Sequence, residues 1–225
     1  MILFLGIIIL YKLIINNIFK NNVDVHSLFR SFFCFFISTL SMGSSIINWN
    51  HLNTNPLNPT YLSTIINKLM FSYMIVDTGY FVLEKNTRLE LLIHHAICIG
   101  LYGFFLDKSL LSFCSISEIL SSFNWIGILY PNHEWSIKLF RLYAIIFIRL
   151  GVWILTLGIL SKYTYYYWIG LIFVFIFICL DCYWVWIIIS NYLKYKNFIK
   201  QKIISNTNKI LSETNKKFNK FKKNN

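Results

Sequence analysis

The chain has 225 residues, of which 56% are hydrophobic and 19% aromatic, and its formal net charge is +12 at pH 7. Soluble domains are about 45–50% apolar even on a count that includes glycine, and here the apolar residues come in repeated long blocks that a water-soluble core of this size cannot hide. The composition therefore excludes a soluble globular domain and indicates an all-α, polytopic membrane protein.

The apolar blocks are long enough to cross a bilayer, which needs about 20 apolar residues per helix. Seven segments qualify as transmembrane helices, and the first is the weakest because Lys12 and Asn16 interrupt it. The segment 49–60, with Pro56 and Pro59, is the clearest turn region. The predicted spans are 2–19, 28–48, 61–83, 89–106, 110–130, 139–160 and 165–192.

Basic residues gather in alternate loops, which predicts the orientation of the chain. One set of connections carries Lys20 and Arg30, Lys85 and Arg88, Lys138 and Arg141, and the C-terminal tail. The other set carries only Lys108 and Lys162. Because cytosolic loops carry an excess of Lys and Arg, the tail is predicted to lie in the cytosol.

The tail from Lys194 onward contains ten lysines and a single acid, Glu213. Beside a last membrane helix, such a tail is typical of a cytosolic anchor on anionic lipid headgroups, not of nucleic-acid binding. Its polar composition predicts a flexible or amphipathic surface segment. The end, Lys222-Lys223-Asn224-Asn225, resembles a dilysine retrieval signal of endoplasmic reticulum proteins, which implies retrieval machinery as a partner; a chance match in a Lys-rich tail is the alternative.

Ionisable side chains inside the predicted spans are the candidate functional residues. Each charge costs about 2.5–3.5 kcal/mol at a helix centre, so it persists only when it is paired, faces a cavity or snorkels to the interface. They are Lys12, Lys68, Asp77, His94, His95, Glu118, Arg149 and Asp181. The five cysteines show neither a CxxC pair nor a zinc spacing, and we expect no metal site.

His94 and His95 lie inside the apolar run 89–106. Neighbouring helical residues diverge by about 100°, so one ring is expected to face a cavity or substrate and the other a neighbouring helix. A rise of about 1.5 Å per residue places Asp77 roughly 9 Å and His94 roughly 7.5 Å from the cytosolic ends of their helices. We therefore expect Asp77 near the histidine pair, where neutral His serves as a base or nucleophile.

Glu118 and Arg149 lie nearer the middle of the bilayer and are predicted to form an ion pair, with interhelical stabilisation as the alternative to a functional role. Glu118 belongs to a stripe of small polar side chains that must face protein or a polar cavity. The stripe contains Ser112, Ser115 and Ser122, flanked by Ser117, Ser121 and Asn124. Asp181 has no predicted partner.

The stretch 73–147 resembles the TLC family (TRAM, Lag1 and CLN8 homology). The matching residues are Asp77, Tyr80-Phe81, Arg88, Leu91-Leu-Ile-His-His95, Glu118-Ile-Leu-Ser-Ser-Phe123 and, on a later helix, Arg149. The resemblance implies a six-helix TLC-type bundle or barrel over 28–193 in the endoplasmic reticulum membrane. An extra N-terminal helix and loop (1–27) precede it, and the basic cytosolic tail (194–225) follows.

Within that family, ceramide synthases use paired histidines for acyl transfer from acyl-CoA and carry a second acidic cluster that this sequence lacks. The chain is more similar to the TLC-domain-only, CLN8-like branch, whose Glu-x-Ser-Thr-Pro-Phe pattern is met by Glu118, Ser121 and Phe123 but not by Leu120 and Ser122. That branch implies lipid sensing, lipid homeostasis or lipid trafficking, with a membrane lipid or fatty-acyl ligand and no cofactor.

The alternative is an acyl-CoA-dependent acyltransferase of the ceramide synthase type, with acyl-CoA as co-substrate. A histidine would then be base or acyl acceptor, and Asp77 would hold its ring. The candidate catalytic residues are His94, His95 and Asp77. The residues expected to line a polar lipid cavity are Arg88, Glu118, Ser121, Asn124, Arg149 and Asp181.

Overall fold

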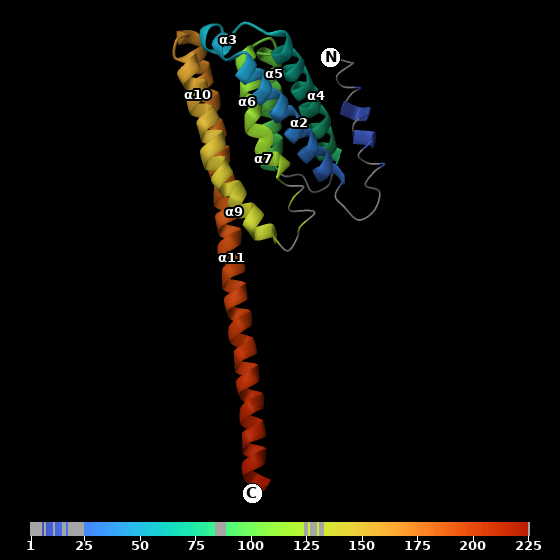
Figure 1. Cartoon of the computed structure of the whole chain (residues 1–225), viewed down its shortest axis with the longest axis vertical. Helices are drawn as coiled ribbons and strands as arrows, with labels where there is room; N and C mark the ends of the chain where they lie inside the picture. The colour runs from blue at the N-terminus through green and yellow to red at the C-terminus, as the bar shows by residue number, and fades with distance from the viewer. Residues whose placement is uncertain are drawn as a thin grey trace. The chain divides into compact units, whose positions relative to one another are not determined.

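The computed structural model of the chain describes residues 25–83, 89–123 and 133–224, together with residues 6, 8–10, 12–14, 17, 126 and 130. The regular structure of the described residues is helical throughout, as the sequence predicts (Figure 1). The chain divides into two compact units, Met1–Tyr183 and Trp184–Asn225. The first unit holds the helices that build the candidate site.

Helices α2 (Val25–Ile47) and α4 (Tyr61–Leu83) form one side of the first unit and match two predicted spans. Their contact is apolar and aromatic: the rings of Phe33 and Tyr73 stack with centroids 4.4 Å apart. A short helix, α3 (Trp49–Thr54), occupies the region predicted as a turn. It ends before Pro56 because a proline disfavours helical backbone in the residue that precedes it.

Helix α5 (Leu89–Phe104) packs against α4 and carries the histidine pair. The predicted span 110–130 is described continuously only as far as residue 123, and this part is not one regular helix. It consists of α6 (Ser109–Cys114), a 3-10 turn η1 (Ser115–Glu118) and α7 (Ile119–Ser122). Serine hydroxyls along it bond to backbone carbonyls three or four residues back, as Ser112 does to Ser109 at 2.7 Å, and this competition favours tighter turns.

Helices α9 (Glu134–Ala144) and α10 (Leu150–Leu160) are joined without a break by a π-helical turn, η3 (Ile145–Arg149), so that the predicted span 139–160 is helical. Such π-turns are rare and occur often at functional sites. Here the turn ends on Arg149, the one charged side chain within it. The irregularity therefore coincides with a candidate functional residue.

Helix α11 (Thr164–Asn224) contains the last predicted span and continues through the tail. The tail was predicted to be a flexible or an amphipathic surface segment, and the structure gives it a helical backbone. No glycine or proline follows Gly170, so nothing in the sequence breaks the helix. At Gly170 the helices α10 and α11 approach closely, because a Cβ at this position would overlap the end of the Leu160 side chain, which would have to move.

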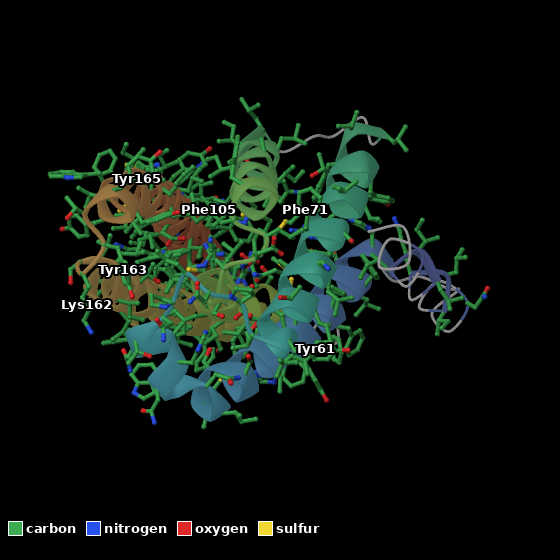
Figure 2. All side chains as sticks on the ribbon, turned by 90° about the horizontal axis from the view of Figure 1, so that it is seen from above. Tyr61, Phe71, Phe105, Lys162, Tyr163 and Tyr165 are labelled. Carbon is green, nitrogen blue, oxygen red and sulfur yellow. The ribbon has the colours of Figure 1, made fainter. Side chains whose placement is uncertain are left out.

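The end of the first unit where α3 lies is fastened by the loop between α10 and α11. Tyr163 donates a hydrogen bond to the Thr54 carbonyl at 2.8 Å, and Lys162 donates one to the Asn53 carbonyl at 3.3 Å. Figure 2, which looks onto this end, shows Lys162 and Tyr163 beside α3, with side chains filling the space between the helices.

Among the described residues, three helical stretches are long and apolar enough to cross a membrane: His26–Ile47, Trp135–Leu160 and Thr164–Asn208. Large apolar side chains such as Phe147, Ile154 and Phe175 are exposed on their outer faces. The chain is thus an all-helical protein with several apolar helices suited to a membrane. The predicted first span, 2–19, falls mostly outside the described residues.

Candidate functional site

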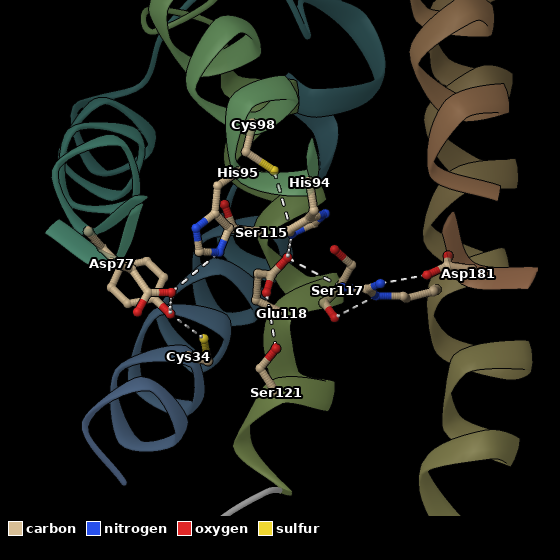
Figure 3. A network of polar contacts seen from close by, with 12 residues as sticks. Cys34, Asp77, His94, His95, Cys98, Ser115, Ser117, Glu118, Ser121 and Asp181 are labelled. Carbon is tan, nitrogen blue, oxygen red and sulfur yellow. Dashed lines mark hydrogen bonds and ion pairs between the residues drawn. The ribbon is translucent and has the colours of Figure 1, made fainter. Parts of the chain in front are cut away.

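Two clusters of buried ionisable side chains lie next to α5, one reached by His95 and the other by His94 (Figure 3). The rings diverge because the two residues are consecutive on a helix, as the sequence predicts. Their centroids are 5.7 Å apart. Each imidazole therefore has its own carboxylate and its own set of helices.

The first cluster, the Asp77 cluster, is centred on a carboxylate with no exposed surface. His95 Nε2 lies 3.3 Å from Asp77 Oδ2, and the Tyr73 hydroxyl donates to the same oxygen at 3.2 Å. From α2, Arg30 Nε lies 3.0 Å from Oδ2 and His26 Nε2 lies 2.8 Å from Oδ1. The cluster thus joins α2, α4 and α5 through one carboxylate.

Sequence reasoning placed Asp77 near the histidine pair but missed His26 and Arg30. Arg30 was interpreted only as a charge that marks the cytosolic end of a span. A signal was present: His26 and Arg30 are four residues apart, which places both on one face of a helix. A buried carboxylate needs a cation of this kind, since an uncompensated buried charge is strongly destabilising.

The second cluster, the Glu118 cluster, joins α5, η1, η3 and α11. His94 Nε2 and Arg149 Nη2 both lie 3.5 Å from Glu118 Oε1, so the predicted pair of Glu118 and Arg149 is present. Arg149 Nη1 also donates to Asp181 Oδ1 at 2.5 Å, which gives Asp181 the partner that the sequence did not reveal. Trp153 donates to the second oxygen of Asp181 at 3.2 Å.

The charges of the Glu118 cluster balance only with His94 included. Glu118 and Asp181 supply two carboxylates, and Arg149 supplies one guanidinium. When a neutral His94 accepts a proton, the numbers of positive and negative charges become equal, which lowers the cost of burying the resulting imidazolium. His94 is therefore the titratable member of the cluster whose protonation sets its net charge.

A cavity lies between α5, α6–η1, α10 and α11, and His94 and Glu118 belong to its wall. It measures about 100 Å³ by the space open to the centre of a water-sized sphere. The rest of the wall is mostly apolar and aromatic, including Leu111, Trp153, Val174 and Phe177. A mostly apolar wall with a few polar groups is the usual lining of a small-ligand site.

The remaining residues that were predicted to form the site have different positions. Asp77, His95, Ser121, Arg149 and Asp181 are not among the lining residues of this cavity, so its wall is less polar than predicted. These groups have protein partners instead: His95 contacts Asp77, Arg149 contacts Asp181, and Ser121 donates to Glu118 Oε2 at 3.3 Å.

The predictions for Arg88 and Asn124 fall outside the described residues, as do the side chains of Lys222 and Lys223. Within the described part of the chain, no group of three or more His, Cys, Asp or Glu side chains is arranged to hold a metal ion. The imidazole of His94 and the carboxylate of Glu118 share the cavity wall with two thiols, those of Cys98 and Cys114, and with the side chain of Lys108 and several hydroxyl groups.

Comparison of the chain with protein-family models, with curated proteins and with solved structures finds no match.

Proposed function

We propose that the chain is a multi-pass membrane protein that binds the acyl chain of a lipid in the cavity between α5 and α11 and acts in lipid sensing, lipid homeostasis or lipid trafficking. One observation carries the proposal: an apolar cavity whose polar groups include the buried pair His94 and Glu118. Apolar walls suit an acyl chain, and the polar pair suits the ester, amide or carboxyl group at its head.

The proposal includes seven spans, six of them forming a TLC-type bundle over 28–193. The three apolar helices supply the outer surface. Helices α4, α5 and α6–α7 carry the buried polar clusters and would be the inner helices, which need not face lipid on all sides. At about 1.5 Å per residue, α5 is roughly 24 Å long, somewhat short of a hydrocarbon core of about 30 Å.

The resemblance to the TLC-domain-only, CLN8-like branch supports the lipid-related roles, the endoplasmic reticulum location and the cytosolic tail. The dilysine end at Lys222 and Lys223 fits retrieval to that membrane. An alternating distribution of loop charges supports the orientation. On this orientation His94 lies in the cytosolic half of the membrane.

A second function is favoured by one specific contact. His94 lies 3.5 Å from Glu118 at the wall of the cavity, and a histidine held by a carboxylate is the arrangement of a general base. The protein would then be an acyltransferase that takes acyl groups from acyl-CoA delivered from the cytosol. Membranes containing the intact chain, incubated with labelled acyl-CoA and several acceptor lipids, would form labelled product; no label and no product across the acceptors would exclude this function.

Lipid binding is tested by photo-crosslinking the full-length protein with a fatty acid that carries a diazirine and an alkyne. Val174 lines the cavity and is buried, whereas Ile172 on the same helix is 60% exposed and does not line it. We expect Val174→Trp to fill the cavity and abolish labelling, and the matched control Ile172→Trp to keep it. Equal labelling of both variants would contradict the proposed site.

A further inference from the structure

Cys98 lies one helical turn after His94, and both side chains line the cavity. The Cys98 Sγ is 3.7 Å from His94 Nε2, and the side chain is only 5% exposed. The other cysteines differ: Cys34 contacts the Tyr73 hydroxyl, Cys114 lines the same cavity but contacts the Thr156 hydroxyl, and Cys179 and Cys182 are exposed. Among the described contacts, Cys98 alone pairs a thiol with an imidazole.

Glu118 completes a group of three. The same Nε2 atom of His94 that faces the thiol lies 3.5 Å from Glu118 Oε1, so one ring nitrogen has both a thiol and a carboxylate beside it (Figure 3). A thiol becomes a nucleophile when a neighbouring base accepts its proton, and a carboxylate stabilises the imidazolium that results. The group of Cys98, His94 and Glu118 therefore has the parts needed to activate a thiol.

The cavity has room beside the Cys98 thiol for the group that the thiol would attack. Apolar side chains from four helices, among them Leu111, Trp153 and Phe177, surround the space next to Cys98. An acyl chain that fills this space has its carbonyl carbon beside the thiol when its head lies at the His94 end. The walls also keep bulk water away from a thioester formed there.

We propose that Cys98 accepts an acyl group from an acyl thioester and holds it as an S-acyl cysteine, with the carbons next to the carbonyl in the cavity. The Cys98 sulfur attacks the carbonyl carbon of the donor, and a new sulfur–carbon bond forms as the donor's sulfur–carbon bond breaks. His94 takes the thiol proton and returns it to the departing thiolate. One thioester replaces another, so the step needs neither an oxidant nor a reductant.

This inference rests on the proposed lipid-binding function and assigns the bound acyl group a covalent site. It differs from the acyltransferase alternative because the acceptor is a residue of the chain itself. The role given to His94 is proton transfer, and the role given to Glu118 is to position that imidazole.

The experiment uses the full-length protein in detergent and an alkyne-tagged long-chain acyl-CoA. We expect one acyl chain per protein by intact mass and release of the tag by neutral hydroxylamine. Cys98→Ser should lose at least tenfold of the tag, and His94→Gln should slow its uptake by a similar factor. The double variant Cys179→Ser/Cys182→Ser is the matched control; it removes two exposed cysteines outside the cavity and should keep the tag.

Two results would overturn the inference. The first is that the unmodified sequence takes up no tag although the diazirine fatty acid still crosslinks to the cavity. The protein would then bind lipid without being acylated. The second is that the Cys98→Ser variant still takes up the tag, or that the double variant Cys179→Ser/Cys182→Ser loses it. Loss of both the tag and the crosslink from the intact chain would instead contradict the proposed function. Crosslinking of Cys98→Ser shows whether that variant still folds around its cavity.

Discussion

His94 and His95 are adjacent in the chain, yet their Nε2 atoms contact carboxylates on different elements, Glu118 in η1 and Asp77 on α4. The two histidines therefore belong to two separate clusters. His94 belongs to the cavity wall, and His95 belongs to the packing of α5 against α4 and α2. The two residues should respond differently to substitution.

The first prediction concerns this difference. His95→Ala removes a partner of the buried Asp77 and should lower the free energy of unfolding by about 1–3 kcal/mol, while labelling by the diazirine fatty acid persists. His94→Ala should lower labelling by about tenfold, equivalent to about 1.4 kcal/mol of binding free energy. Thermal unfolding in detergent and crosslinking yield measure the two effects. Equal losses of labelling in both variants would contradict the separation.

The second prediction concerns Arg149. Arg149→Met leaves Glu118 and Asp181 buried without their shared guanidinium, and it should destabilise the protein by about 3–5 kcal/mol. Lys138→Met is the control: Lys138 lies over the Trp135 ring near the start of α9, and its loss should cost less than about 1 kcal/mol. Unfolding by increasing denaturing detergent compares the two. A small loss for Arg149→Met would show that the buried pairs contribute little.

The sequence predicted more of the helices than of their contacts. The apolar blocks of the sequence predicted α2, α4, α5 and α10. The length of an apolar block can be read from consecutive residues, without knowing how the helices pack. Helical rise predicted that Asp77 and the histidine pair share one depth, but not which ring meets the carboxylate, because rise gives height and not direction around the axis.

Contacts between distant helices were the harder part. The pairing of Asp181 with Arg149, and of Arg30 with Asp77, depends on how α11 and α2 pack, which no local pattern encodes. Local irregularities were missed for another reason: η1 follows from serine hydroxyls that bond to the backbone, and η3 lies within a segment whose composition is that of an ordinary helix.

The third prediction concerns the close approach of α10 and α11. Gly170→Ala places a methyl group against Leu160 and should destabilise the protein by about 1–3 kcal/mol. Gly158→Ala is the matched control, because a Cβ at Gly158 meets nothing within 4 Å. Gly170→Ala should cost less when it is made in a Leu160→Ala background, because the side chain that the new methyl group meets is then absent. A double-mutant cycle on thermal stability checks this, and additive effects would contradict the contact.

The fourth prediction concerns orientation. Because basic residues mark the cytosolic loops, an epitope placed after Asn225 should bind antibody when only the plasma membrane is permeabilised. An epitope inserted between Asn55 and Leu57 should stay protected until the inner membranes are opened as well. Both tags are read by fluorescence in the same cells. A protected C-terminal tag would reverse the orientation and place His94 in the opposite half of the bilayer.

The claim that the cavity holds a lipid is tested most directly by the positions at which a fatty acid crosslinks to the protein. The diazirine fatty acid bound to the full-length protein should attach to peptides of α5, α10 and α11 that line the cavity, and peptide mass spectrometry should find them modified. Val174→Trp should remove those modifications, and Ile172→Trp should leave them in place. Crosslinks confined to the outer faces of the helices, unchanged by Val174→Trp, would contradict the claim that this cavity holds a lipid.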